Sequence, residues 1–126
     1  MTPQDVVDFY EALSRGETDA LGSRLAEEVV LEFPGSRFGG RFEGRRKVLL
    51  FLRQNQRLFE GGLRFTVPWC VVVGDRAVAQ WTNAGTTREG AAYANRGVTV
   101  FRLVDGRIVE IQDYLDTERL AATWPK

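Results

Sequence analysis

The chain has 126 residues, 44% of them hydrophobic, and its 17 acidic and 17 basic side chains cancel to a formal net charge of zero. That length predicts a single domain, residues 1–126, with a core of its own, and the balanced charge gives no reason to expect nucleic acid or a membrane as a partner. Histidine is absent, which excludes serine–histidine and cysteine–histidine nucleophile pairs and histidine-ligated zinc.

The first half of the chain is predicted to be mainly helical. Thr2 with Asp5 three residues later is typical of a capping box, and Gly16 ends the first helix. A second, shorter helix is expected from Thr18, and a short strand over 29–33 ends at Pro34. The next nine residues, 36–44, hold three glycines and are expected to form a loop. A third helix is predicted from about residue 45 to residue 59.

The second half changes to the period of two that is typical of strands. Four long runs are predicted as strands, separated by glycine-containing turns: Leu63–Val73, Arg76–Arg88, Ala92–Val104 and Arg107–Leu115. Each run is about twice the usual strand length of roughly 5–6 residues, so we expect a strongly curved antiparallel sheet. A terminal helical turn begins at Thr117. This order of elements predicts an α+β fold with the helices on one face of the sheet.

Two segments carry a resemblance to a known family. They are the phrase over 25–30, LAEEVV, and the segment over 100–116, which runs from VFRLVDGRIVE to DYLD. With the order of elements, they resemble the SnoaL-like branch of the nuclear transport factor 2-like superfamily over nearly the whole chain. The resemblance implies a cone-shaped fold in which a curved sheet wraps around the N-terminal helices and encloses one central pocket. Its members include isomerases, polyketide cyclases, epoxide hydrolases and non-catalytic proteins, so the fold settles no activity.

The catalytic residues of these relatives are only partly present. Where ketosteroid isomerases have an aspartate before a proline, this chain has Phe33, and their oxyanion-hole aspartate corresponds to about Thr99. Their first-helix tyrosine matches Tyr10 with a spacing that is off by one. The resemblance therefore implies that isomerisation by their mechanism is incomplete here.

The other two enzyme classes leave one residue in common. Of the aspartate–arginine–aspartate set of limonene epoxide hydrolases, only the last-strand aspartate survives, as Asp113, and the other two positions fall on Gln80 and Thr82. SnoaL-type cyclases also rely on an acidic residue at the position of Asp113, although their partnering histidine is absent here. The resemblance thus implies Asp113 as the catalytic candidate.

The alternation of the last strand supports the same residue. Asp113 shares one strand face with Val109, Ile111 and Leu115. A carboxylate on an apolar face is costly unless it is paired or neutralised, and burial would raise its pKa into the range useful for acid–base chemistry. The alternative is a hydrated or arginine-paired carboxylate at the open end of the fold.

The neighbours of Asp113 depend on the register of the last hairpin. A two-residue turn at 105–106 would place Asp113 opposite Val98, whereas a three-residue loop over 104–106 would place it opposite Gly97. We adopt the three-residue loop because it agrees with the family resemblance. It brings two candidate hydrogen-bond donors to the pocket beside the carboxylate: Asn95 and Thr99.

Further polar and aromatic side chains are predicted to line the pocket, whereas the side chain of Trp81 is predicted to lie outside it. Gln80 and Thr82 would share a face with Val78, as a polar pair that orients a ligand or as part of an exposed sheet face. Trp69, which follows Phe65 and Val67 at period two, is expected on the wall. Trp81 would then point to the convex side of the sheet, where it suggests a homodimer interface. With Asp113, the predicted ligand site comprises Tyr10, Phe33, Trp69, Gln80, Thr82, Asn95 and Thr99.

Localisation and cofactors follow from what the sequence lacks. No metal site is expected, and the Gly39-Gly40 pair is too short for a phosphate-binding loop, so no cofactor is expected. The first residues lack the basic and apolar regions of a signal peptide and no apolar segment could span a bilayer, so we expect a cytoplasmic protein.

Three functions remain open. The first is an enzyme of the cyclase or isomerase type that acts by carboxylate chemistry on a mostly apolar, carbonyl-bearing ligand. The second is a non-catalytic binder of a small hydrophobic molecule. The third is an oligomerisation module that uses the convex face of its sheet.

Overall fold

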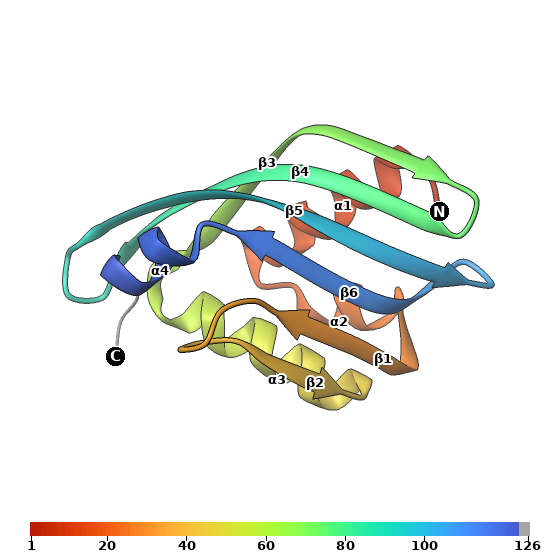
Figure 1. Cartoon of the computed structure of the whole chain (residues 1–126), viewed down its shortest axis with the longest axis horizontal. Coiled ribbons are helices and arrows are strands. Elements are labelled where there is room, and N and C mark those ends of the chain that lie inside the picture. The colour runs from red at the N-terminus through yellow and green to blue at the C-terminus, as the bar shows by residue number, and fades with distance from the viewer. Residues whose placement is uncertain (124–126) are drawn as a thin grey trace.

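The computed structural model describes residues 1–123 as four helices on one side of a curved six-stranded sheet (Figure 1). The helices are α1 (Pro3–Arg15), α2 (Thr18–Gly22), α3 (Arg45–Arg57) and α4 (Thr117–Thr123). The strands are β1 (Leu25–Phe33), β2 (Gly40–Glu43), β3 (Phe59–Val73), β4 (Arg76–Thr87), β5 (Ala92–Val104) and β6 (Arg107–Leu115). The α+β class, the curvature and the cone-shaped arrangement around the N-terminal helices are thereby confirmed.

Local signals in the sequence fix the ends of α1. The Thr2 hydroxyl accepts a hydrogen bond from the backbone N–H of Asp5 at 3.2 Å, and the Asp5 carboxylate accepts one from the backbone N–H of Thr2 at 2.8 Å. This is the predicted capping box. Gly16 ends the helix in the left-handed conformation with φ of 70°, which glycine adopts without a steric penalty.

The sheet differs from the prediction in two respects. Its order is β2-β1-β6-β5-β4-β3, and β1 pairs with β6 in parallel, so the sheet is mixed rather than wholly antiparallel. Within the predicted loop over 36–44, residues 40–43 form β2, which pairs with β1 in an antiparallel ladder from Val30–Glu43 to Phe33–Gly40. Gly35, which precedes this stretch, lies in the reversal between the two strands and has a φ of 95°, a conformation that glycine adopts without a steric penalty.

The Gly61-Gly62 pair does not end a helix. Helix α3 stops at Arg57, and β3 already begins at Phe59. Both glycines have positive φ and lie where the β3–β4 register shifts between Glu60 and Arg64. They therefore form an irregularity inside a long strand, which helps the sheet to bend.

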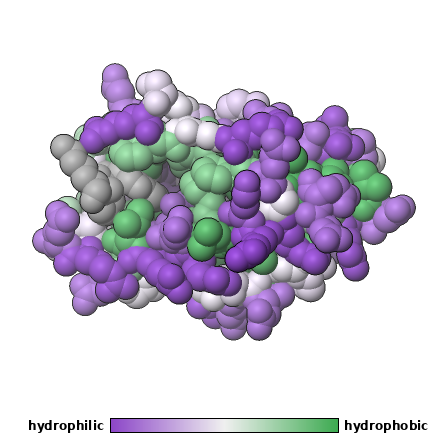
Figure 2. All heavy atoms as spheres, turned by 90° about the horizontal axis from the view of Figure 1, so that it is seen from below, coloured by the Kyte–Doolittle hydropathy of each residue, from purple (hydrophilic) through white to green (hydrophobic). Residues whose placement is uncertain are grey.

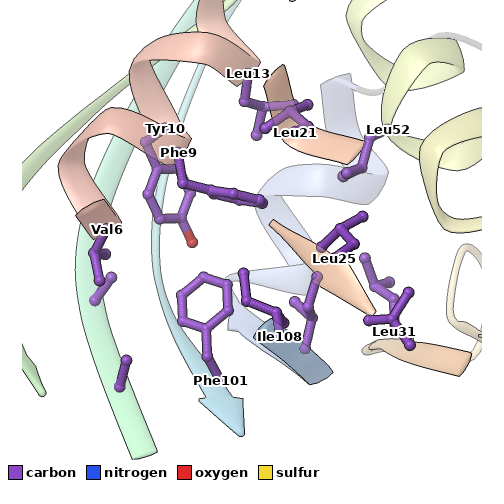
Figure 3. Close-up of a cluster of buried hydrophobic side chains, with 14 of the residues drawn as sticks. Val6, Phe9, Tyr10, Leu13, Leu21, Leu25, Leu31, Leu52, Phe101 and Ile108 are labelled. Atoms are coloured by element: carbon purple, nitrogen blue, oxygen red, sulfur yellow. The ribbon is translucent and has the colours of Figure 1, made fainter. Parts of the chain in front are cut away.

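The main core lies between the helices α1 to α3 and the concave face of the sheet (Figure 3). Phe9 of α1 meets Phe101 of β5 edge-to-face, with ring centroids 5.6 Å apart. On β4, Ala77 and Ala79 are fully buried, and side chains this small let a helix pack closely against the strand. Among the described residues, no helix is long and apolar enough to cross a membrane.

Candidate functional site

A narrow cavity opens between the concave face of the sheet and the helices. Its wall comes from helices α1, α3 and α4 and from strands β1 and β3 to β6. Its volume is about 60 Å³. This is small beside the roughly 300–1,000 Å³ of typical ligand sites, so a planar molecule of one or two rings suits it better than a bulky one. Leu120 of α4 and Phe33 at the end of β1 border it. At the α4 end of the molecule, apolar surface shows between hydrophilic side chains (Figure 2).

Asp113 is the one charged residue among the described residues that line this cavity. Its carboxylate accepts a hydrogen bond from the Thr99 hydroxyl, with Oγ1 and Oδ1 2.6 Å apart. The Thr99 oxygen in turn accepts a hydrogen bond from the indole N–H of Trp81 at 2.8 Å. An indole N–H can only donate, so this bond directs the single hydroxyl proton of Thr99 toward Asp113. Oδ1 is therefore held as an acceptor, and no described residue donates a hydrogen bond to the other oxygen, Oδ2.

Burial raises the pKa of Asp113 from 3.8 to about 6, and the hydrogen bond from Thr99 acts in the opposite direction. The side chain keeps part of its surface open to the cavity, but the surrounding protein removes it from bulk water. A carboxylate with this pKa is ionised at neutral pH and close enough to neutrality to take up and return a proton. Among the described residues, no cationic group within 4 Å pairs with it.

Tyr10 supplies a neutral hydroxyl on the same wall. Burial raises its pKa well above the usual value of 10, the negative charge of Asp113 raises it further, and the hydroxyl of Thr99 lowers it. Its side chain points from α1 into the core, with the hydroxyl at the inner end (Figure 3). Tyr10 therefore stays protonated and can donate a hydrogen bond to an oxygen of a bound molecule.

A β-bulge in β6 brings Asp113 and Thr99 together. The turn has two residues, Asp105 and Gly106, both with positive φ, so the three-residue loop of the prediction is wrong. Leu103 pairs with Ile108, but the next residue pairs one position further on, because Val109 is an extra residue in β6.

The bulge makes Thr99 the direct partner of Asp113. Neither predicted register is correct, since one set Val98 and the other Gly97 opposite this aspartate. The expectation that Thr99 and Asp113 face the same pocket is nevertheless confirmed.

Asn95 does not join them. It is buried, but its side-chain amide donates to the Tyr93 hydroxyl at 2.9 Å and to the carbonyl oxygen of Asp116 at 3.1 Å, and its oxygen accepts from the backbone N–H of Arg96 at 2.8 Å. Both ends of the amide are therefore engaged by the protein. Because the bulge moves Asp113 opposite Thr99, Asn95 lies beyond the end of the β5–β6 ladder rather than beside the carboxylate.

The predicted facing of β4 is wrong. Its inward residues have odd numbers, so Gln80 and Thr82 are exposed on the outer face and Trp81 is buried in the pocket wall. Small inward alanines and an outward valine, Val78, concealed this phase in the sequence. Gly97 on β5 makes room for the indole: a Cβ there would lie 2.6 Å from Cζ2 of Trp81.

Trp69 is also misplaced by the prediction. It is 53% exposed and pairs with Gln80 on the outer face, although Phe65 and Val67 before it point inward. The β3–β4 register shifts between Thr66 and Trp69. Pro68 falls in this bulge, where its missing N–H costs no ladder bond, and the extra residue turns Trp69 outward.

The cavity also contains a polar residue that the prediction missed. Asn83 follows Trp81 at period two on β4 and lines the cavity. If Trp81 had been assigned to the inner face, the period of two would also have placed Asn83 there. Of the predicted site residues, four lie on the cavity wall: Tyr10, Phe33, Thr99 and Asp113.

The comparisons with known proteins agree with this architecture. The model of the SnoaL-like domain family matches residues 6–111, so the chain belongs to that family. None of the curated proteins searched matches the chain.

Several solved structures are similar to the chain. Bal32a, from a soil-derived mobile gene cassette, is 20% identical with a TM-score of 0.88, over 97% of this chain and 95% of that one. An NTF2-like protein of unknown function from Burkholderia pseudomallei is 26% identical with a TM-score of 0.83, over 94% and 93%. A protein from Xanthomonas campestris that is described as a candidate polyketide cyclase is 25% identical with a TM-score of 0.76, over 93% of this chain and 91% of that one. The family thus includes cyclases and isomerases, whose shared fold this chain has.

Proposed function

We propose that this SnoaL-like domain is an enzyme that moves a proton on a small, mostly apolar carbonyl compound, in the manner of a cyclase or isomerase. The observation that carries the proposal is Asp113, a carboxylate with a pKa raised to about 6 in a cavity whose other described lining residues carry no charge. Because burial of an unpaired carboxylate is costly, a purely structural role for it has no evident benefit. A perturbed carboxylate in a cavity is instead typical of acid–base sites.

The arrangement supports one balanced step. Oδ2 of Asp113 takes a proton from the carbon next to the carbonyl group, and the C–H electron pair moves into the carbonyl to form an enolate. The hydroxyl of Tyr10, which lines the same cavity, donates a hydrogen bond to the enolate oxygen. The protonated Asp113 then returns the proton to the same carbon or to another one. Thr99 keeps Oδ1 as an acceptor throughout and so leaves Oδ2 for the transfer.

The test is hydrogen–deuterium exchange of a bicyclic ketone. In 2-indanone the protons next to the carbonyl are acidified by the ring, and their loss in D2O is followed by proton NMR. Wild-type protein is expected to accelerate the exchange, and Asp113→Asn to reduce it to the rate in buffer.

The matched control for this exchange experiment is Asp105→Asn, at an exposed turn residue with φ of 51° that asparagine also adopts. The control should match wild type. Equal exchange rates in wild type and Asp113→Asn would contradict the proposal.

The second candidate function is a non-catalytic binder of a small hydrophobic molecule. The narrow, mostly apolar cavity favours it, because such a cavity suffices for binding without chemistry. Calorimetric binding of 2-indanone by wild type without any acceleration of exchange would support this function over the enzyme.

A further inference from the structure

Asn83 is a buried amide whose oxygen no described residue satisfies. The residue is 7% exposed and lines the cavity, and Oδ1 has no hydrogen-bond partner within the described part of the chain. A buried polar atom without a partner lowers the stability of the fold, and most buried polar atoms in folded proteins are paired. An apolar side chain of similar size would avoid this cost.

Asn95, which lies directly opposite Asn83 on the neighbouring strand, is an example of an asparagine with a structural role. Asn95 pairs with Asn83 in the β4–β5 register. Its amide makes hydrogen bonds at both ends, to Tyr93, Asp116 and Arg96. Two neighbouring asparagines on the same face thus differ: one is fully engaged by the protein, and the other presents an amide to the cavity wall.

Asn83 and Asp113 lie toward opposite ends of the cavity. Asp113 pairs with Thr99, which pairs with Ala79, and Asn83 follows four residues further along the same strand. Four residues of strand correspond to about 13 Å. Between these two rows stands Trp81, whose indole faces Phe65 with ring centroids 5.2 Å apart. The cavity therefore has a polar group near each end and an aromatic wall between them.

We propose that Asn83 is a second polar contact for the ligand and that the substrate is an apolar carbonyl compound with a hydroxyl group at the end remote from the carbonyl. The orientation rests on the proposed function, which assigns the carbonyl end to Asp113 and Tyr10. A hydroxyl is the matching group because it donates to Oδ1 and also accepts from Nδ2. The terminal torsion of asparagine is soft, so a small rotation turns the oxygen from its enclosed position toward the ligand.

The experiment compares two isosteric ketones by isothermal titration calorimetry at pH 7. The first, 5-hydroxy-2-indanone, carries a hydroxyl opposite its carbonyl, and the second, 5-methyl-2-indanone, carries a methyl group there. Wild type should bind the hydroxyl compound about tenfold more tightly, a factor that corresponds to one hydrogen bond of about 1.4 kcal/mol. In Asn83→Leu the ratio of the two Kd values should fall to about one.

Two further variants serve as controls. Thr82→Val removes a hydroxyl from the adjacent, outward-facing residue and should keep the tenfold ratio. Asn83→Asp retains an acceptor and should keep the preference for the hydroxyl compound, which preserves the test if the leucine variant fails to fold. Free of ligand, Asn83→Leu should melt at the same temperature as wild type or higher, because it loses an unsatisfied oxygen.

Several results would overturn the proposal. The first is that wild type binds neither ketone or does not prefer the hydroxyl compound. The second is that Asn83→Leu keeps this preference. The third is that Asn83→Leu melts several degrees below wild type. The last result would mean that a bound water or a protein group satisfies the amide. Binding of this pair is measured separately from exchange. A protein that selects the hydroxyl compound but exchanges no proton would therefore refute only the catalytic role of Asp113.

Discussion

Replacement of Asp113 by asparagine should stabilise the protein at neutral pH and leave it nearly unchanged in acid. Burial raises the pKa of this carboxyl in the folded state from 3.8 to about 6. Between these values the folded protein holds a proton that the unfolded chain has lost. The free energy of unfolding therefore falls as pH rises through this window and levels off above about pH 6. Asparagine has no charge to bury, so its variant lacks this loss.

The size of the effect follows from the same pKa. Each pH step of one within the window costs about 1.4 kcal/mol, so the interval from 3.8 to about 6 costs the wild type at most about 3 kcal/mol. Urea unfolding of both proteins at several values between pH 4 and pH 8 gives the difference in free energy. It should rise by up to this amount in favour of the variant, and the rise should be complete near pH 6.

The comparison isolates one group because other titrating groups are common to both proteins. Asp5, whose pKa is lowered by hydrogen bonds from Thr2, has the opposite effect on the pH dependence of stability, and it cancels in the difference. A difference that stays flat between pH 4 and pH 8 would refute the reasoning, since it would mean that Asp113 is hydrated or paired and has an ordinary pKa. A difference in unfolding free energy that falls as pH rises would have the opposite sign to the predicted one and would also refute the reasoning.

Three other perturbations test the surroundings of the site. Thr99→Val removes a hydrogen bond that lowers the pKa of Asp113, so the acidic limb of the pH–rate profile for 2-indanone exchange should move to higher pH; an unmoved limb would contradict the role of that bond. Gly97→Ala places a Cβ 2.5 Å from the backbone oxygen of the next strand and should cost about 1–3 kcal/mol in urea unfolding, whereas Gly40→Ala, with ordinary 3.5 Å contacts, should cost less. We also propose a homodimer through the outer sheet face, which exposes Trp69; Trp69→Glu should then yield monomers in sedimentation velocity, and a wild type that is already monomeric would exclude this dimer.

Most of the architecture could be predicted from the sequence because its signals are local. The capping box at Thr2 and the glycine stop at Gly16 depend on residues three to five positions apart, and both are present as predicted. Three of the four long strands agree with their predicted ranges within one residue at either end. The parallel pairing of β1 with β6 is not local, since the two strands are separated by most of the chain. No short-range pattern reports it.

The facing of side chains could not be predicted beyond a bulge. A period of two assigns every residue of a strand to one face or the other, and one extra residue reverses that assignment for all that follow. This reversal moved Trp69 to the outside at the bulge beside Pro68. The sequence marks that position with a proline, which argues against an uninterrupted strand, so the error had a readable signal.

The bulge at Val109 is less clearly marked in the sequence than the bulge beside Pro68, but it has a larger effect on the site. Ile108 and Val109 are consecutive apolar residues, and both are buried, which strict alternation forbids. Without this extra residue the two-residue turn would set Asp113 opposite Val98, and no hydroxyl would face the carboxylate. With it, Asp113 meets Thr99, and the indole of Trp81 orients the hydroxyl between them. The proposed acid–base site thus depends on one irregular residue, four positions before Asp113, as much as on the carboxylate itself.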